Sequence, residues 1–301
     1  MRRAGEVVGG VPLYERDSRL GSFVSPRLLL YYLGPILRRS ESKYPSQQTA
    51  RNVETLEALA GALGGLGHAQ VTLKARHTVA DVRPFLLAGW SCSPTYTYVV
   101  SLSELPKQWN RVEQNLRRLV DRCAAEDVRF SEDDDFESFL GLHHLTMLHH
   151  GAAPYLPDEA FRRWFQTLHR AGLCRLFQAR LPDGQVLAAQ LVLLGTHPVS
   201  HTVCAATDPV HRRLGAAAFL RWRAFEWLGA HGKTGNDLTD AALGPVTHFK
   251  SQFGGELVTN FVVQNRGTVA WRAGSALELG YRRARQQAGA LVRRGRNPSR
   301  S

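Results

Sequence analysis

The sequence has 301 residues and a formal net charge of +12 at pH 7, with 44% hydrophobic and 21% charged residues. This composition is typical of a globular protein, and the length predicts two compact units rather than one. Apolar stretches fall well short of a bilayer-spanning helix, and the N-terminus lacks the apolar run of a secretory signal. We therefore expect a cytoplasmic protein.

Metal ligands are not predicted. The four cysteines lie far apart, without a Cys-x-x-Cys pair: Cys92, Cys123, Cys174 and Cys204. This pattern favours reduced thiols in a reducing compartment. Four histidines stand in two pairs six residues apart, which is not the i, i+4 spacing of helical zinc ligands. These are His143, His144, His149 and His150.

Most of the positive charge lies in the C-terminal tail. Residues 271–301 hold eight arginines against one glutamate, so the rest of the chain carries +5. Apolar side chains recur there at steps of four and three, which predicts a basic amphipathic helix: Leu277, Tyr281, Ala284, Ala288 and Leu291. Such a helix would lie on an anionic membrane surface, at the inner face of the membrane, or dock a partner; a solvated extension is the alternative.

Extended and helical patterns alternate along the chain. The first hundred residues predict a strand over 6–14, a helix over about 46–63, and strands over 70–74 and 95–102. From residue 105 the predicted order is helix, helix, helix, hairpin, strand, helix, strand, helix, strand. The acidic segment 131–139 suits the first turn of the second of these helices, because negative charge is favoured at the positive end of the dipole.

A single helix is predicted over residues 105–125, with one apolar stripe. Its opposite face is basic: Lys107, Arg111, Arg118 and Arg122. This face is either a solvated surface or a strip that binds phosphates.

The most informative motif is HRRLGAAAFL, residues 211–220, where a strand ends and a helix begins. Small residues let a ligand approach the backbone, and the first amides of the helix, with its dipole, favour a phosphate group. We therefore predict a phosphate-binding turn made by six residues: Arg212, Arg213, Leu214, Gly215, Ala216 and Ala217.

This turn resembles the pyrophosphate-binding signature of the GNAT superfamily, (Q/R)-x-x-G-x-(G/A), with Arg212, Gly215 and Ala217 at the defining positions. The predicted order of elements around it is similar to a GNAT core. The following segment resembles the FemAB-like pattern of an aspartate on a strand and then Phe-Lys-x-x-Phe-Gly-Gly. The matching residues are Asp237, Phe249, Lys250, Phe253, Gly254 and Gly255.

The resemblance implies an α/β (α+β) fold of two tandem GNAT-like units, each with a mixed sheet flanked by helices. It implies an incomplete N-terminal unit at 1–104, a complete acyltransferase domain at 105–266, and a basic tail at 267–301. The first unit is expected to be short or truncated, because the strand and helix that open it in the family are missing upstream of Glu6.

The resemblance also implies a reaction in which an acceptor amine attacks a thioester or ester carbonyl directly. The enzyme then mainly positions the reactants and stabilises charge. Candidates for the group that removes the amine proton are His201, Asp237 and Asp240. Lys250 would neutralise a phosphate or an oxyanion. The structural alternatives are a packed histidine at 201, an aspartate that holds a turn at 237, and a surface lysine at 250.

Two donors fit the family, an acyl-coenzyme A and an aminoacyl-tRNA. The phosphate-binding turn favours coenzyme A, whereas the basic helix face would serve a tRNA acceptor stem. Neither is a permanently bound cofactor. The family implies a role in cell-envelope, peptidoglycan or polysaccharide metabolism. The alternative is an inactive GNAT-like binding or scaffold protein.

Overall fold

The computed structural model describes residues 1–277 except 4 and 40, and it consists of two compact units. Unit 1 comprises Met1–Pro94 and the described residues from Asn260 onward, and unit 2 is Thr95–Thr259. Two strands, β8 (Ser91–Ser101) and β14 (Glu256–Gln264), cross the boundary, so each contributes residues to both units.

Unit 1 contains one long helix and several short strands. Its further elements are β1 (Arg2–Arg3), β2 (Glu6–Val7), β3 (Gly9–Gly10), β4 (Glu15–Arg16), β5 (Phe23–Val24), β6 (Ile36–Leu37), α1 (Pro45–Gly65), β7 (Gln70–Ala75) and α2 (Arg83–Leu87). Strands β4, β5, β7 and β14 are neighbours in that order, while β1 pairs with β2 and β3 with β6. Residues 269–277 are helical.

The helix α1 confirms the prediction for residues 46–63. Its buried side chains recur at helical spacing and pack with those of β7 and β14 in one core: Leu56, Leu59, Ala60, Leu63, Val71, Leu73 and Val263. The single strand predicted over 6–14 is wrong, because two-residue strands occupy Glu6–Val7 and Gly9–Gly10. Adjacent glycines and Pro12, which has no N–H, weaken a continuous ladder there.

Unit 2 holds the remaining elements. These are α3 (Leu105–Arg111), α4 (Gln114–Ala125), β9 (Arg129–Asp133), α5 (Phe136–His150), α6 (Asp158–Arg170), β10 (Cys174–Arg180), β11 (Val186–Leu193), β12 (Val199–Thr207), the 3₁₀ turn η1 (Arg212–Leu214), α7 (Ala216–Ala230), β13 (Gly235–Asp237) and α8 (Pro245–Ser251). The strands lie in the order β8-β13-β12-β11-β10-β9. In this order β12 and β13 pair in parallel, and the other neighbours pair antiparallel.

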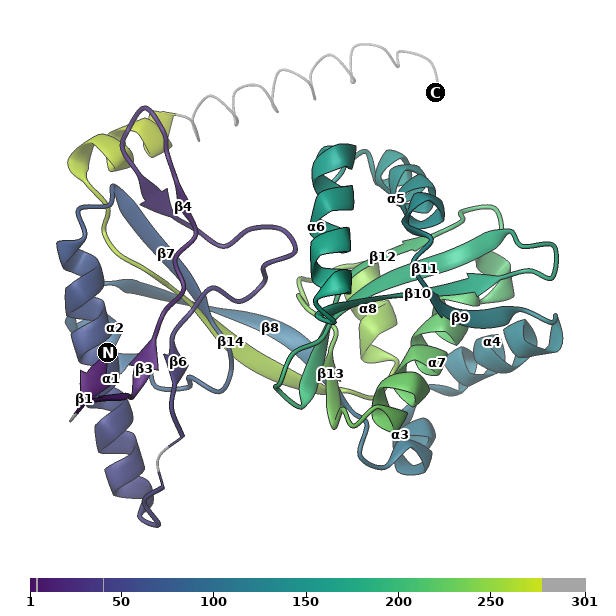
Figure 1. The fold of residues 1–301 in the computed structure, drawn as a ribbon, viewed down its shortest axis with the longest axis horizontal. Coiled ribbons are helices and arrows are strands. Elements are labelled where there is room, and N and C mark those ends of the chain that lie inside the picture. Colours follow the sequence, from purple (N-terminus) through teal and green to yellow (C-terminus); the bar gives the residue numbers. More distant parts are fainter. Residues whose placement is uncertain (4, 40, 278–301) are drawn as a thin grey trace, which may run out of the picture. The chain divides into compact units, whose positions relative to one another are not determined.

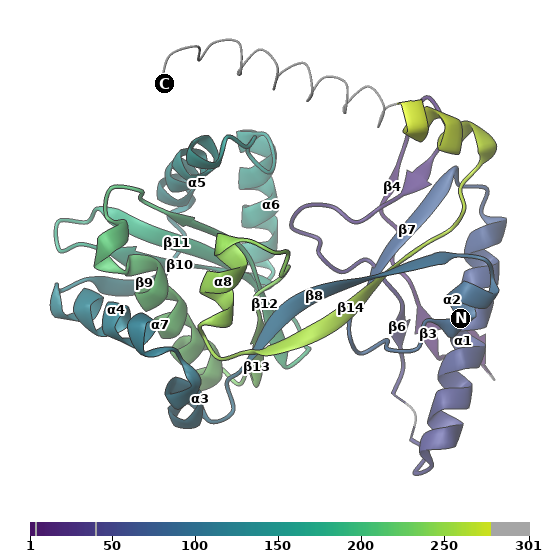
Figure 2. The same ribbon diagram turned by 180° about the vertical axis from the view of Figure 1, so that it is seen from behind.

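Helices cover both faces of the unit 2 sheet. Helices α5 and α6 pack on one face, and α7 packs on the other with α4 outside it (Figure 1). Figure 2 shows the same layers from behind. Because both faces are covered, β10 and β11 are buried along most of their length, which explains their nearly continuous apolar sequences. The mixed sheet flanked by helices confirms the predicted fold class.

The start of unit 2 departs from the predictions in part. The single helix over 105–125 is broken at Val112 and Glu113, where Val112 is buried and the Glu113 N–H donates to the Gln252 carbonyl at 2.9 Å. The acidic segment 131–139 begins in strand β9, which was not predicted, and then opens helix α5 as expected, with Glu137 in the first turn. Asp135 then caps α5, accepting the Ser138 N–H at 3.1 Å.

The tail predicted as a basic amphipathic helix lies almost wholly outside the described residues, and the described part ends at Leu277. None of the helices in the described ranges combines the length and the apolarity that a bilayer crossing requires.

Gly254 offers a test of how the motif around it packs. Its φ is +71°, and an added Cβ would lie 2.6 Å from the Cβ and carbonyl oxygen of Arg111. We expect Gly254→Ala to lower the free energy of unfolding by about 3 kcal/mol, from left-handed strain and overpacking together. Urea denaturation monitored by circular dichroism measures this change.

Gly232 provides the matched control, because its φ is +78° but no atom lies within 4 Å of an added Cβ. Gly232→Ala should cost about 1 kcal/mol, the strain alone. Equal losses for the two variants would contradict the close approach at Arg111.

Candidate functional site

The parallel pairing of β12 with β13 is short. Three residue pairs are in register, from Val199 with Gly235 to His201 with Asp237. Beyond them β13 ends, whereas β12 continues to Thr207. The parallel ladder therefore stops at the pair of His201 and Asp237, while β12 continues.

A β-bulge in β12 lies next to this point. Leu191 of β11 pairs with Cys204 and its neighbour Val192 pairs with Thr202, so Val203 is an extra residue on β12. A bulge bends its strand and increases the local twist. The bend therefore coincides with the separation of β12 from β13.

His201 and Asp237 share one face of the sheet. His201 pairs with Leu193 and Cys204 pairs with Leu191, and residues two apart on a strand share a face. Cys204 Sγ lies 3.7 Å from Nδ1 of His143 on α5. His201 and Asp237 therefore lie on the α5 face.

Asp237 is completely buried and anchors the chain on both sides of β13. Its Oδ1 accepts the Thr97 hydroxyl from β8 at 2.5 Å and the Thr239 N–H at 2.8 Å. Its Oδ2 lies 3.5 Å from Nδ1 of His201. The side chain of His201 is 20% exposed, so this residue connects the buried carboxylate to the surface of the site.

A second set of polar side chains ties the two strands together on the opposite face. The Thr202 hydroxyl donates to Oδ1 of Asn236 at 2.9 Å, and Nδ2 of Asn236 donates to the Ser200 hydroxyl at 2.9 Å. The Thr239 hydroxyl donates to the Thr202 carbonyl at 2.6 Å. These bonds satisfy buried groups that the short ladder leaves unpaired.

The turn after β13 is left-handed at two non-glycine residues, Thr239 with φ +43° and Asp240 with φ +59°. The Lys250 ammonium donates to the carbonyls of both, at 2.7 Å to Asp240. Lys250 thus lies against the turn, and the structure brings it to Asp240. Asp240 itself is exposed.

The six-residue turn predicted to bind phosphate leads into α7 at the carboxyl end of β12. Gly215 has φ +85°, and an added Cβ would lie 2.8 Å from the Leu119 carbonyl oxygen. This glycine is therefore required by the approach of α4. The N–H groups of Ala216 and Ala217 open the helix and have no intrahelical acceptor. Arg212 and Arg213 are exposed, and Ala217 is partly exposed.

Two residues at the site were missed from the sequence. Asp208 Oδ2 lies 2.8 Å from Nδ1 of His211, and Asp208 Oδ1 accepts the Val210 N–H at 2.8 Å. Burial opposes ionisation of Asp208, but His211 and Val210 outweigh it and lower its pKa. In the sequence, the Asp-x-x-His spacing just before the turn could have indicated this pair.

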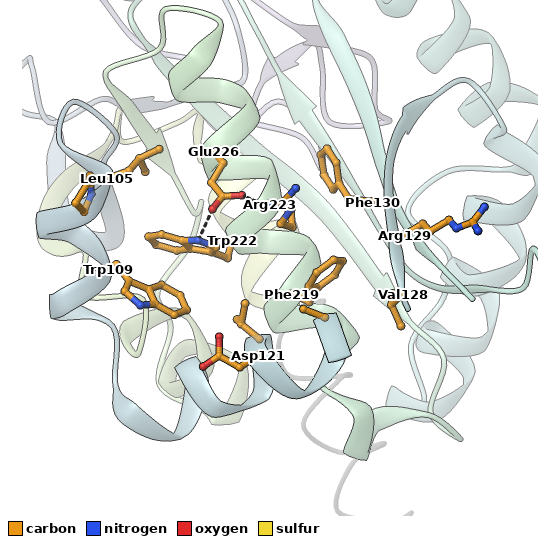
Figure 3. A pocket seen from close by; sticks show the side chains of 13 residues that line it. Leu105, Trp109, Asp121, Val128, Arg129, Phe130, Phe219, Trp222, Arg223 and Glu226 are labelled. Carbon is orange, nitrogen blue, oxygen red and sulfur yellow. Dashed lines mark hydrogen bonds and ion pairs between the residues drawn. The ribbon is translucent and has the colours of Figure 1, made fainter. Parts of the chain in front are cut away.

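A separate open groove of about 940 Å³ lies on the α7 face (Figure 3). Trp109 and Trp222 lie in it with ring centroids 4.4 Å apart, and Nε1 of Trp222 donates to Glu226 at 2.9 Å. None of the ten predicted site residues lines this groove.

The geometry agrees with comparisons to known proteins. A model of the acetyltransferase (GNAT) domain matches residues 107–251. The chain carries a GNAT acetyltransferase domain. No curated protein matches the chain.

Solved structures share the fold over most of the chain. The structure of FemX has 13% identity and a TM-score of 0.66, over 87% of this chain and 86% of its own. L-PGS from Bacillus licheniformis has 10% identity and a TM-score of 0.57, over 85% and 82%. The third structure is the C-terminal domain of a protein from Agrobacterium fabrum that is designated a lysylphosphatidylglycerol synthetase. It has 14% identity and a TM-score of 0.58, over 87% of this chain and 83% of its own.

The histidines of the GNAT domain do not form a metal centre in the described part of the chain, where no group of three His, Cys, Asp or Glu side chains is placed to hold an ion. His143 is fully buried and accepts the Tyr155 N–H at Nε2. His144 instead lies 2.9 Å from Asp158 on α6. The first pair of histidines therefore packs α5 against its surroundings.

Stability should depend on pH through His143. Burial, with a smaller effect of His144, lowers its pKa to about 4 from 6.5. Between these values the unfolded chain binds a proton that the folded chain does not, so stability falls as pH falls from 6.5 to 4. We expect a contribution of about 3 kcal/mol. Urea unfolding of the wild type and of His143→Gln across this range measures it.

In His143→Gln this part of the pH dependence should disappear, whatever the variant's stability at neutral pH. His150→Gln, an exposed position on the same helix, should retain it. The same pH dependence in both variants would show that His143 is not the responsible group.

Proposed function

We propose that the protein is an N-acyltransferase that moves an acyl group from acyl-coenzyme A to an amine acceptor. The observation that carries the proposal is that, within a GNAT domain, the parallel ladder of β12 and β13 ends near the turn into α7. Both lie at the carboxyl end of β12. An extended donor would enter between the strands with its diphosphate at the helix N-terminus.

The donor's diphosphate would bind the first turn of α7. The unpaired N–H groups of Ala216 and Ala217 and the positive end of the helix dipole favour an anion there. Arg212 and Arg213 are exposed beside it and would add attraction. Gly215 would contribute by its backbone, because the space at its Cα is occupied by α4.

The acceptor amine would lose its proton on the α5 face. His201 is the candidate base, because it is partly exposed and lies beside Asp237. Asp237 would act through His201, since a fully buried carboxylate cannot touch the acceptor. Lys250 would hold the turn at Thr239 and Asp240 and so fix the width of the gap between the strands. Asp240 remains a second candidate base by its exposure.

An aminoacyl-tRNA donor is the second candidate. It is favoured by the fold shared with the protein designated a lysylphosphatidylglycerol synthetase, a name that denotes an aminoacylated lipid product. An acceptor in cell-envelope metabolism and a location at the inner face of the membrane belong to this proposal. Acyl-coenzyme A is preferred because the small first turn of α7 suits a diphosphate.

Activity is tested by mixing purified protein with panels of acyl-coenzyme A or aminoacyl-tRNA donors and amine acceptors, and detecting the acylated product by mass spectrometry. A thermal shift induced by a donor gives an independent readout of binding. A scaffold protein without activity would give neither a product nor a donor-induced shift.

The donor site is tested at Ala217. We expect Ala217→Glu to weaken acyl-coenzyme A binding about tenfold or more, because the carboxylate would oppose the diphosphate. The free energy of unfolding should hold or rise by about 0.5 kcal/mol, since negative charge is favourable at a helix N-terminus. Isothermal titration calorimetry and urea denaturation measure the two effects.

Ala217→Gln is the control, because it has the same shape without the charge. It should bind the donor more tightly than Ala217→Glu. If both variants bind as the wild type does, the first turn of α7 is not the donor site.

The pairing of His201 with Asp237 is tested by kinetics. His201→Gln should lower kcat about 100-fold or more with little change in the donor KM, because a proton acceptor is lost. Asp237→Asn, which can still accept the Thr97 and Thr239 bonds, should lower kcat less. The double variant should be no slower than His201→Gln, because Asp237 acts only through His201.

Steady-state kinetics of the three variants decide the point, with the exposed His231→Gln as a control of unchanged rate. If the fold-losses in kcat of the two single variants multiply in the double variant, the two residues act separately. An unchanged rate in His201→Gln would remove His201 as the base and leave Asp240 to be tested.

A further inference from the structure

Arg221 is a buried cation in the middle of α7. The residue is 5% exposed, and its Nε and Nη1 are buried without a hydrogen-bond partner among the described residues. No carboxylate in the described part of the chain forms an ion pair with it. Its guanidinium carbon lies 5.9 Å from the centre of the Phe253 ring.

This arrangement is costly for the protein alone. A buried charge without a partner loses its hydration, and a cation–π contact offsets only part of that loss. Burial lowers the pKa of Arg221 to about 10, so the side chain still carries its charge at neutral pH. A buried arginine in this condition suits an anion that arrives from outside.

The position of Arg221 points to the first turn of α7. It follows Ala217 by four residues, which places the two on one face of the helix. Long side chains on a helix lean toward its N-terminus, which would direct the Arg221 guanidinium toward the turn that Ala217 occupies. Its other neighbour, Phe253, belongs to the Phe-Lys-x-x-Phe-Gly-Gly motif.

The surroundings raise the positive potential further. The N–H groups of Ala216 and Ala217 and the positive end of the helix dipole lie one turn away. A planar guanidinium can donate two parallel hydrogen bonds to phosphate oxygens, which makes arginine well suited to such a group.

We propose that Arg221 is a binding residue for the donor diphosphate, which it contacts from beneath the first turn of α7 while the helix amides contact it from the end. The proposal deepens the proposed function and rests on its donor site. It distinguishes Arg221 from the exposed Arg212 and Arg213, whose charges are solvated whether or not a donor is present. Arg221 would be the charge that is compensated only when the donor binds.

The experiment uses Arg221→Met, which keeps an unbranched apolar stem and removes the charge. Binding of coenzyme A and of inorganic pyrophosphate is measured by isothermal titration calorimetry, and stability without ligand by urea denaturation. We expect both dissociation constants to rise about tenfold or more. The urea midpoint without ligand should be unchanged or higher, because an uncompensated buried charge is removed.

Arg223→Met is the matched control, because Arg223 is exposed, lies two residues away and pairs with Glu226 at 2.7 Å. It should change neither dissociation constant. Arg221→Lys keeps the charge without the planar fork and should bind with intermediate affinity.

Higher dissociation constants together with an unchanged or higher urea midpoint in Arg221→Met identify the binding role. A lower urea midpoint with unchanged dissociation constants in Arg221→Met would mean that Arg221 only supports the fold, and would overturn the proposal. Absence of pyrophosphate and coenzyme A binding in the wild type would also overturn it. If an aminoacylated acceptor-stem RNA alone binds, and binds equally well to Arg221→Met, the diphosphate assignment fails.

Failure of the proposed function is separate. Pyrophosphate binding that depends on Arg221, in a protein that transfers no acyl group in the donor and acceptor panels, would leave the anion site in place. It would then mark the protein as one that binds a diphosphate ligand without catalysis.

Discussion

The site depends on how a single buried carboxylate is satisfied. Asp237 ends the parallel ladder of β13, and its oxygen accepts both the Thr97 hydroxyl and the Thr239 N–H. The second bond requires the chain to fold back two residues after the strand, into the left-handed region at Thr239 and Asp240. Beyond Asp237 the parallel ladder with β12 stops, while β12 continues beside β11. The end of the parallel ladder thus coincides with the hydrogen bonding of one residue, Asp237.

The turn is stabilised from the next helix. The carbonyls of Thr239 and Asp240 accept hydrogen bonds from the Lys250 ammonium, and Lys250 belongs to α8. After α8, Gly254 adopts a backbone conformation and a proximity to Arg111 that a side chain would prevent. The Phe-Lys-x-x-Phe-Gly-Gly segment therefore fixes the turn after β13 at one end and the α3–α4 break at the other. Gly254 is explained by its backbone conformation and its packing, without a role in chemistry.

Local patterns predicted most elements of unit 2 because each element buries one recognisable face. The hairpin of β10 and β11, strand β12, helix α7 and strand β14 were found from alternation, helical spacing and a Pro-Asp-Gly turn. Strand β9 was missed because its acidic sequence matches a helix start as well as an edge strand. The break at Val112 was missed because its cause, the Gln252 carbonyl, lies 139 residues away along the chain.

The candidate site could be predicted only as a set of residue types. Motif spacing brought Asp237, Lys250 and the turn at Gly215 into view, but not their partners, since Thr97 is 140 residues from Asp237. Arg221 shows the limit most clearly, because in the sequence it is one arginine among many on a basic chain. What distinguishes it is burial, which changes the energetic meaning of a charge. Exposed arginines add to a diffuse field, whereas a buried one without a counter-charge creates a localised requirement for an anion. Net charge therefore predicts an affinity for phosphates, but only the folded chain can indicate where a phosphate is needed.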